Sequence, residues 1–128
     1  MLRGRHVLVT GASSGLGRHF AELCARNGAL VTVAARRRDR LESLVEKLLE
    51  LGAEGANALD LDVSDIASVE RAMAAATAAA PLDVVVNNAG IADNRPALDI
   101  NEALFDAVVD TNVKGVWAVS TAAARTWR

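Results

Sequence analysis

Short apolar runs alternate along the chain with longer stretches in which apolar residues recur at helical spacing. The aliphatic and β-branched runs predict four strands, at residues 6–10, 30–35, 56–60 and 82–86. The last run contains three consecutive valines, which indicates burial on both faces, as in a parallel sheet. Apolar residues three and four positions apart predict helices between the strands, at residues 15–27, 39–52 and 64–80.

Residues that favour helix ends bound these three helices. Asp39 is expected to cap the second helix, and either Ser64 or Asp65 the third. A residue that favours helix termination stands at the end of each helix: Gly28 after the first, Gly52 at the end of the second and Pro81 after the third.

The last part of the chain has a different pattern. A polar loop from Asn88 to about Asp99 precedes helical spacing over residues 101–128. One side of this segment is apolar and carries Leu104, Phe105, Val108, Val109, Val113, Val116 and Trp117. Two consecutive helices and one bent helix both fit the spacing.

The order of elements, a strand followed by a helix four times over, predicts an α/β fold with a doubly wound parallel sheet. Right-handed crossovers then place the strands in the order 3-2-1-4. Because the sequence has no linker and no internal repeat, we expect residues 1–128 to form one domain.

Composition and charge narrow the possible partners. The net charge of −2, from 14 basic and 16 acidic side chains, indicates no general nucleic-acid or membrane surface. Cys24 is the only cysteine, which excludes an internal disulfide and a cysteine-based zinc site, and we expect no metal site. No signal peptide or membrane span is recognisable, so the expected location is cytoplasmic.

A glycine-rich segment lies between the first predicted strand and the first predicted helix. It reads Thr10, Gly11, Ala12, Ser13, Ser14, Gly15, Leu16, Gly17. Glycines at such a junction allow a tight turn and a close approach to a pyrophosphate, and the N–H groups of the helix N-terminus favour its negative charge. The spacing Gly-x-x-x-Gly-x-Gly is not that of a P-loop, and a dinucleotide is the expected ligand.

The end of the second predicted strand indicates which dinucleotide is bound. An acidic residue is expected there for the ribose hydroxyls of NAD, and an arginine for the 2′-phosphate of NADP. The sequence has Ala35 and Arg36, followed by Arg37 and Arg38. A guanidinium binds phosphate through two parallel hydrogen bonds, so Arg36 predicts a preference for NADP(H). Arg37 and Arg38 are more typical of a solvated helix entrance.

Four motifs in register resemble the short-chain dehydrogenase/reductase family, which has a Rossmann-type fold. They are the glycine segment, the Asp62-Val63 pair after strand three, Asn87-Asn88-Ala89-Gly90 after strand four, and Asn112-Val113-Lys114-Gly115 in the last helical segment. The resemblance implies a hydride transfer between NADP(H) and a carbonyl or alcohol substrate.

The resemblance also implies roles for individual residues. Asp62 would bind the adenine amino group and Val63 would pack on the ring. Asn88, Ala89 and Gly90 would line the ribose and nicotinamide side. Asn112 matches the asparagine of the family's Asn-Ser-Tyr-Lys tetrad, which holds a water in the proton relay.

The remainder of that tetrad has no counterpart, because the sequence contains no tyrosine and its only lysines are Lys47 and Lys114. The chain is therefore expected to be the N-terminal half of such an enzyme, without strands five to seven and inactive alone. A dinucleotide-binding module or pseudoenzyme is the alternative. The family implies a homo-oligomer through the helices around residues 101–127.

A sheet that stops at the fourth strand leaves residues 84–86 unpaired on one side. The apolar side of residues 101–127 would then be partly exposed, and we expect the isolated chain to be marginally stable and prone to association.

Overall fold

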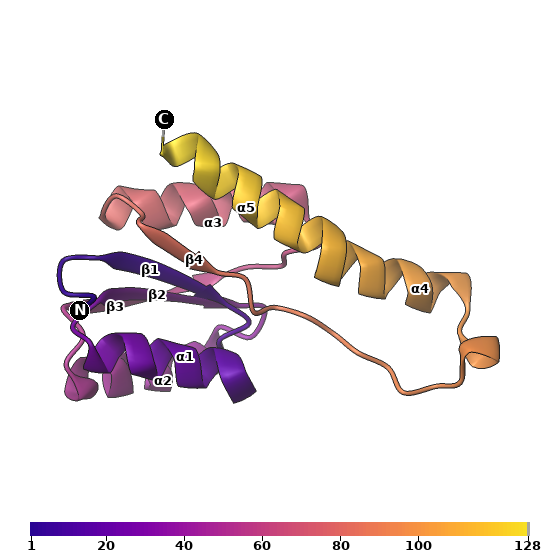
Figure 1. The fold of residues 1–128 in the computed structure, drawn as a ribbon, viewed down its shortest axis with the longest axis horizontal. Helices are drawn as coiled ribbons and strands as arrows, with labels where there is room; N and C mark the ends of the chain where they lie inside the picture. The colour runs from indigo at the N-terminus through magenta and orange to yellow at the C-terminus, as the bar shows by residue number, and fades with distance from the viewer. Residues whose placement is uncertain (128) are drawn as a thin grey trace.

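The computed structural model describes residues 1–127 as alternating strands and helices (Figure 1). The strands are β1 (His6–Thr10), β2 (Leu30–Ala35), β3 (Gly55–Asp60) and β4 (Val84–Val86). The α-helices are α1 (Gly15–Arg26), α2 (Asp39–Leu51), α3 (Ile66–Ala79), α4 (Glu102–Val109) and α5 (Gly115–Thr126). A short 3₁₀ helix, η1 (Ala97–Asp99), precedes α4, and a π-helix, η2 (Asp110–Lys114), joins α4 to α5.

The four strands form one parallel sheet in the order β3-β2-β1-β4. Helices α1 and α2 cover one face of this sheet, and α3 and α5 cover the other (Figure 1). The fold is therefore the Rossmann-type doubly wound arrangement, and the expected strand order 3-2-1-4 is confirmed.

Successive residues of β1 point to opposite faces of the sheet and so divide between two apolar clusters. Val7 and Val9 pack in the cluster that includes Leu44 of α2. Leu8 packs on the other side with Val119 of α5. All five side chains are at most 1% exposed. Cover on both faces explains why β1 and β2 read as mainly apolar runs without regular polar alternation.

Most expected helix ends agree with the structure. Gly28 and Gly52 follow α1 and α2 with positive φ angles of 82° and 111°. Asp65, rather than Ser64, caps α3, because its Oδ1 accepts a hydrogen bond from the N–H of Ala67 at 3.0 Å. The expected cap at Asp39 is wrong by one position: this residue is the first of α2.

Strand β4 begins two residues later than expected. The carboxylate of Asp83 accepts the backbone N–H of His6 through Oδ2 at 2.8 Å, while the N–H of Asp83 donates to the carbonyl of His6 at 3.0 Å. A side-chain oxygen therefore takes the place of a backbone carbonyl, and the regular ladder starts only at Val84.

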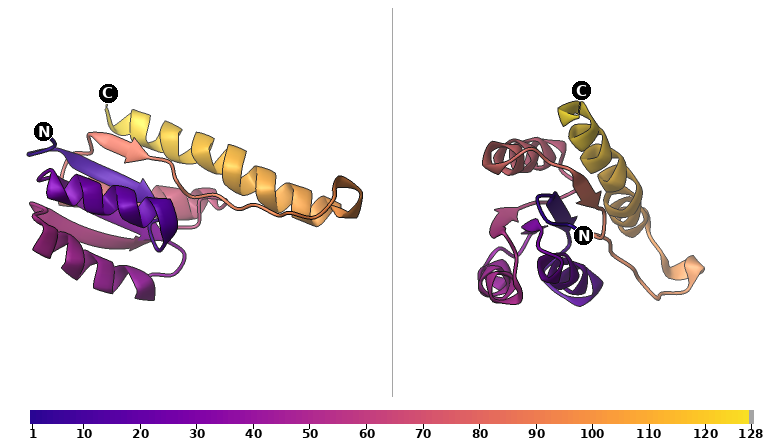
Figure 2. Two further views of the ribbon diagram at one scale, coloured as in Figure 1. Left: turned by 60° about the horizontal axis from the view of Figure 1, so that its bottom comes forward. Right: turned by 60° about the vertical axis from the view of Figure 1, so that its left-hand side comes forward.

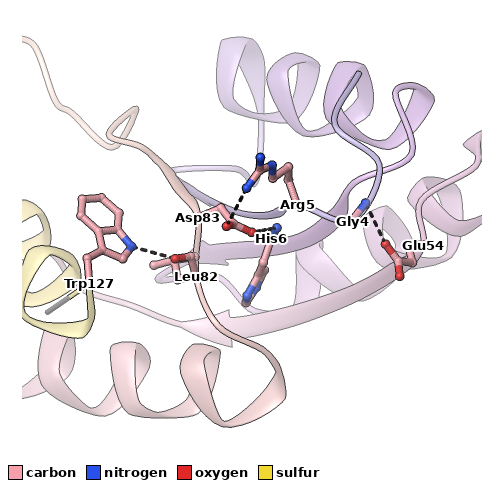
Figure 3. A network of polar contacts seen from close by, with 7 residues as sticks. All are labelled: Gly4, Arg5, His6, Glu54, Leu82, Asp83 and Trp127. Atoms are coloured by element: carbon pink, nitrogen blue, oxygen red, sulfur yellow. Dashed lines mark hydrogen bonds and ion pairs between the residues drawn. The ribbon is translucent and has the colours of Figure 1, made fainter.

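A polar network joins the elements at this amino-terminal end of the sheet (Figure 3). The Nδ1 atom of His6 lies 3.0 Å from the carbonyl of Ala80, and its Nε2 lies 2.7 Å from Oγ1 of Thr32. Nearby, the indole N–H of Trp127 donates to the carbonyl of Leu82 at 2.7 Å. These contacts attach the end of α3 and strand β2 to β1, and the end of α5 to the segment that precedes β4.

The segments α4, η2 and α5 follow one another without a break and form one long helical rod (Figure 2). The expected partial exposure of its apolar side is present: Phe105, Val113 and Trp117 are 59%, 64% and 55% exposed. Among the described residues, β4 pairs with β1 alone, so its other edge has no strand partner.

Candidate functional site

The carboxyl ends of all four strands meet around one open cleft of about 310 Å³. Because the strands are parallel, the loops that follow them lie at the same edge of the sheet. The residues that line the cleft are Gly11, Ser13, Ser14, Ala35, Arg36, Arg37, Leu61, Asp62, Val63, Asn88, Ala89, Gly90, Ile91 and Thr111. Nine of the predicted cofactor residues are in this set; Thr10, Gly15, Leu16 and Gly17 are not.

The glycine segment needs its glycines for two different reasons. Gly11 and Gly15 have positive φ angles of 62° and 59°, which favour glycine. A Cβ at Gly11 would also lie only 2.7 Å from Cα of Ala89. At Gly17, a Cβ would collide with the side-chain amide of Asn88 and the carbonyl of Gly11. The glycines therefore allow the β1 loop, α1 and the β4 loop to pack together.

Thr10 lies beneath the cleft and joins two of its loops. The hydroxyl oxygen accepts the backbone N–H groups of Asn88 at 3.1 Å and Ala89 at 3.0 Å, and Thr10 is 1% exposed. The side-chain amide of Asn88 donates to the carbonyl of Gly11 at 3.1 Å. Thr10 thus supports the lining residues without belonging to them.

Two arginines border the cleft where β2 ends. Arg36 and Arg37 are both exposed, and neither forms an ion pair within residues 1–127. The sequence pattern favoured only Arg36 as a ligand residue. The pattern predicts a place for Arg37 at the helix entrance, whereas the structure places it in the lining of the cleft, because residue order alone does not say which guanidinium of a run borders a cleft.

Asp62 and Val63 follow β3, and they differ in how much of the side chain a ligand in the cleft could contact. Oδ1 of Asp62 accepts hydrogen bonds from the N–H and the hydroxyl of Ser64, at 3.0 and 2.6 Å, which fixes the carboxylate in place. Val63 is only 7% exposed and packs against α5, where a Cβ at Gly115 would lie 2.7 Å from its Cγ2. Val63 therefore offers the cleft only a small part of its side chain.

Asn112 lies in the π-helix η2 beside the cleft rather than in its lining. Its Oδ1 accepts the N–H of Ile91 at 2.9 Å, and its Nδ2 donates to the carbonyl of Ile91 at 2.7 Å. Both ends of the side-chain amide are thus engaged by one backbone residue. This pair of bonds positions the Gly90–Ile91 segment. The sequence motif does not predict this positioning role of Asn112.

The loop beyond Ile91 carries an ion pair between Asp93 and Arg95. The backbone N–H and the guanidinium of Arg95 both bind the carboxylate of Asp93, with bonds of 2.8 to 3.2 Å. These hydrogen bonds hold the pKa of the Asp93 carboxyl below its usual range. Neither residue lines the cleft.

The described residues also limit other kinds of site. No three histidine, cysteine, aspartate or glutamate side chains gather as a metal-binding group within residues 1–127. None of the helices in the same part of the chain has the length and apolar character to cross a bilayer.

The residues present fit a dinucleotide. The cleft combines a glycine turn at a helix N-terminus, a carboxylate and two guanidinium groups that form no ion pair within the described residues. Such groups recognise pyrophosphate, phosphate and a polar base. Ser14 at the N-cap of α1 makes no side-chain capping bond. The first N–H groups of this helix are thus not capped by its hydroxyl.

Comparisons with known proteins agree with this arrangement. A sequence model described as short chain dehydrogenase matches residues 5–128. Oxidoreductase UcpA of Salmonella typhimurium is 40% identical over 127 residues, covering 94% of this chain and 46% of the relative.

Solved structures show the same similarity. A short-chain type dehydrogenase/reductase from Mycobacterium marinum is 36% identical with a TM-score of 0.93, covering 98% of this chain and 51% of that one. An alcohol dehydrogenase from the archaeon Thermococcus sibiricus, complexed with 5-hydroxy-NADP, is 31% identical with a TM-score of 0.91, covering 95% and 52%. The chain spans about half the length of these relatives. It therefore belongs to the short-chain dehydrogenase family.

Proposed function

We propose that residues 1–128 form a domain that binds NADP(H) and supplies the cofactor half of an oxidoreductase. The observation that carries this proposal is the convergence of four strand-end loops on one cleft that also contains two arginines without an ion-pair partner in residues 1–127. Helix N-termini and glycine turns favour pyrophosphate, which is common to both nicotinamide dinucleotides.

The proposed roles follow the position of each residue. Gly11, Ser13 and Ser14 would face the pyrophosphate and its ribose. Asp62 would accept a hydrogen bond from the adenine amino group through Oδ2, the carboxylate oxygen to which Ser64 does not donate. The β4 loop, at Asn88, Ala89 and Gly90, would lie along the ribose and nicotinamide. Among the remaining predicted residues, Thr10, Gly15, Leu16 and Gly17 would act by shaping the glycine loop.

The preference for NADP(H) rests on Arg36, with Arg37 beside it. Two guanidinium groups, without an acidic partner in the described residues, provide charge-assisted hydrogen bonds to a 2′-phosphate. The complex of the Thermococcus sibiricus relative with 5-hydroxy-NADP supports this choice.

The activity of the whole protein is proposed to be hydride transfer between NADP(H) and a small carbonyl or alcohol substrate. The bound nicotinamide supplies the hydride chemistry. These 128 residues contain no tyrosine, so the general acid expected for the family would have to come from outside them. Asn112 would contribute by positioning the Gly90–Ile91 segment. The second lone pair of its Oδ1, which Ile91 does not use, would hold a water in the proton relay.

Binding can be tested on the 128-residue chain with NADPH and NADH. At 100 times its dissociation constant, a ligand that binds only the folded state adds about 2.7 kcal/mol to the free energy of unfolding. Arg36→Asp should weaken NADPH binding far more than NADH binding. Arg40→Asp is the matched control, because Arg40 is exposed but does not line the cleft. Equal losses for both cofactors would contradict the 2′-phosphate role, and no binding of either would contradict the proposal as a whole.

A dinucleotide-binding module without turnover is the alternative function. The absence of tyrosine from the 128 residues is the observation that favours it. An assay of NADPH oxidation with carbonyl compounds, performed on the longest natural form of the protein, distinguishes the oxidoreductase from the binding module. A protein that binds NADPH tightly but does not oxidise it supports the binding module.

We further propose that the full-length form is a homo-oligomer through the helices around residues 101–127. The exposed apolar side chains of Phe105, Val113 and Trp117 support this proposal, since large exposed apolar patches are typical of interfaces. Sedimentation velocity of the full-length protein and of a Phe105→Lys/Trp117→Lys variant tests it. The variant should dissociate, and an unchanged sedimentation coefficient would contradict the proposal.

A further inference from the structure

A second groove lies along the edge of the sheet that β3 forms. Among the described residues β3 pairs with β2 alone, and it lies between α2 on one face of the sheet and α3 on the other (Figure 2). The groove has a volume of about 490 Å³, and both helices contribute to its walls. In the described part of the chain, it shares no lining residue with the dinucleotide cleft, so it is a separate feature of the surface.

The register of the sheet determines which backbone groups of β3 face this groove. The N–H of Leu61 donates to the carbonyl of Ala35, whose partner in the register is Asp60. Backbone groups of successive strand residues point to opposite sides, so residues 57 and 59 face β2 in the same way as Leu61. The alternate residues, Ala56 and Ala58, therefore turn their N–H and C=O groups towards the groove.

This edge lacks the usual barriers to the addition of another strand, which are proline, lysine and β-bulges. Residues 55–59 are glycine, alanine, asparagine, alanine and leucine, and they pair with β2 in an unbroken register. The side chains of Ala56 and Ala58 are small and only partly buried. The backbone of an extended peptide can therefore approach the edge closely.

The two walls of the groove differ in chemistry. The α3 wall consists of the methyl groups of Ala75, Ala76 and Ala79. The α2 wall carries the carboxylates of Glu42 and Glu46, which are exposed and form no ion pair within residues 1–127. A peptide between the walls would thus meet acidic groups on one side and apolar groups on the other.

The spacing of the two carboxylates matches that of side chains along a strand. Glu42 and Glu46 are separated by about 6 Å along the helix axis. Side chains two residues apart in an extended peptide lie on the same face, about 6.6 Å apart. Two basic side chains at such positions can therefore meet one carboxylate each, while the residue between them faces the alanine wall. Arg38, one turn before Glu42, also lines the groove and ends the acidic wall.

We propose that this groove binds an extended segment of a partner protein with the pattern basic–apolar–basic, which adds to β3 as a further strand. The proposal goes beyond dinucleotide binding, because it concerns a different surface. The outward backbone groups of Ala56 and Ala58 supply main-chain hydrogen bonds, and the carboxylates select the basic side chains. A second copy of this chain fits less well, since antiparallel pairing of two β3 edges would bring the acidic walls of both copies to the same face of the sheet.

Fluorescence anisotropy of the labelled peptide Thr-Lys-Val-Lys-Thr, titrated with the 128-residue chain, tests the proposal. The wild type should bind the peptide. Glu42→Gln/Glu46→Gln should weaken binding about three- to tenfold, as expected for the loss of two exposed ion pairs. Glu50→Gln/Glu70→Gln is the matched control, because it makes the same change of charge at exposed positions outside the groove, and its affinity should be unchanged.

Two further measurements test the addition of a strand. Ala58→Pro removes an N–H that faces the groove and keeps the hydrogen bonds to β2, so peptide binding should be lost while NADPH binding and the far-UV circular dichroism spectrum are retained. On the peptide, N-methylation at odd or at even residues blocks one set of N–H groups. The affinities of the two methylated peptides should differ at least tenfold, because only one set can face β3.

The outcomes separate this proposal from dinucleotide binding. A wild type that binds NADPH but not the peptide, or that binds the peptide no better than Glu42→Gln/Glu46→Gln does, would overturn the proposal alone. Equal affinities of the two methylated peptides would also overturn it, since charge attraction without strand addition would then explain binding. A wild-type dimer that Ala58→Pro dissociates, together with no peptide binding, would overturn it in favour of a second copy. If Ala58→Pro does not fold, the methylated peptides and the glutamate variants still decide.

Discussion

The hydroxyl of Thr10 is the point at which the glycine loop and the β4 loop are joined, and Thr10→Val tests its contribution. Oγ1 accepts the N–H groups of Asn88 and Ala89, at 3.1 and 3.0 Å, and Thr10 is 1% exposed. The N–H of Asn88 has a second acceptor, the carbonyl of Val86 at 3.0 Å. The N–H of Ala89 has no other partner among the described residues. Valine therefore leaves one N–H unpaired in a nearly unchanged shape.

The magnitude follows from these bonds. A lost hydrogen bond contributes about 1 kcal/mol, and an unpaired buried N–H costs about 1–3 kcal/mol. Because Ala89 is only half-buried, we expect the lower part of this range, a total loss of about 2–3 kcal/mol in the free energy of unfolding. With a urea dependence of about 2 kcal/mol per molar, the urea midpoint should fall by about 1–1.5 M.

Urea unfolding followed by far-UV circular dichroism measures this change. Thr77→Val is the control, because it removes a hydroxyl whose partners are carbonyls of its own helix. Thr10→Ser should recover most of the lost stability. A Thr10→Val protein within about 0.5 kcal/mol of the wild type would refute the view that this hydroxyl holds the two loops together.

Three further predictions concern other parts of the fold. Gly17→Ala should lower the free energy of unfolding by about 1–3 kcal/mol, since the added Cβ collides with the side-chain amide of Asn88. An unchanged midpoint of urea unfolding would contradict this prediction. The backbone N–H of His6 holds the pKa of the Asp83 carboxyl below its usual range. A carboxyl with a lowered pKa stabilises the fold above its unfolded pKa and loses that effect as the pH falls through the folded value. Asp83→Asn should therefore flatten the acid limb of urea midpoints measured from about pH 5 to pH 2, and an equally steep limb would count against this. Trp127→Phe removes the indole hydrogen bond to the carbonyl of Leu82, two residues before β4, and should lower the free energy of unfolding by about 0.5–1.5 kcal/mol, which thermal unfolding can detect.

The strands and the first two helices could be predicted because local signals and tertiary packing agree. The runs at β1 and β2 match the structure residue for residue, since each is a continuous apolar stretch buried on both faces. Strand β4 is shorter than its sequence suggests. There, the carboxylate of Asp83 replaces a backbone acceptor, and no periodicity of apolar residues reveals such a substitution.

The residues of the candidate site also divide into those that the sequence predicts and those that only the structure reveals. Gly11, Arg36 and Asp62 could be identified because each lies directly after a predicted strand, and parallel strands bring their carboxyl ends together. Arg37, Ile91 and Thr111 could not. The place of Arg37 depends on side-chain direction. The places of Ile91 and Thr111 depend on how the helical rod packs against the sheet, and Thr111 lies 25 residues beyond the end of β4 in sequence.

The sequence alone determined the order of elements, the topology of the sheet and the family, because hydrophobic period, glycine placement and short motifs are local properties of the chain. The tertiary structure decided which side chains share the cleft and which only support it. Thr10 is buried beneath it, the side-chain amide of Asn112 is bonded to the backbone of Ile91, and Thr111 of the π-helix η2 lines it. The physical reason is that hydrogen bonds between segments distant in sequence form only where the fold brings these segments together. Their relative positions are determined by packing across the whole sheet.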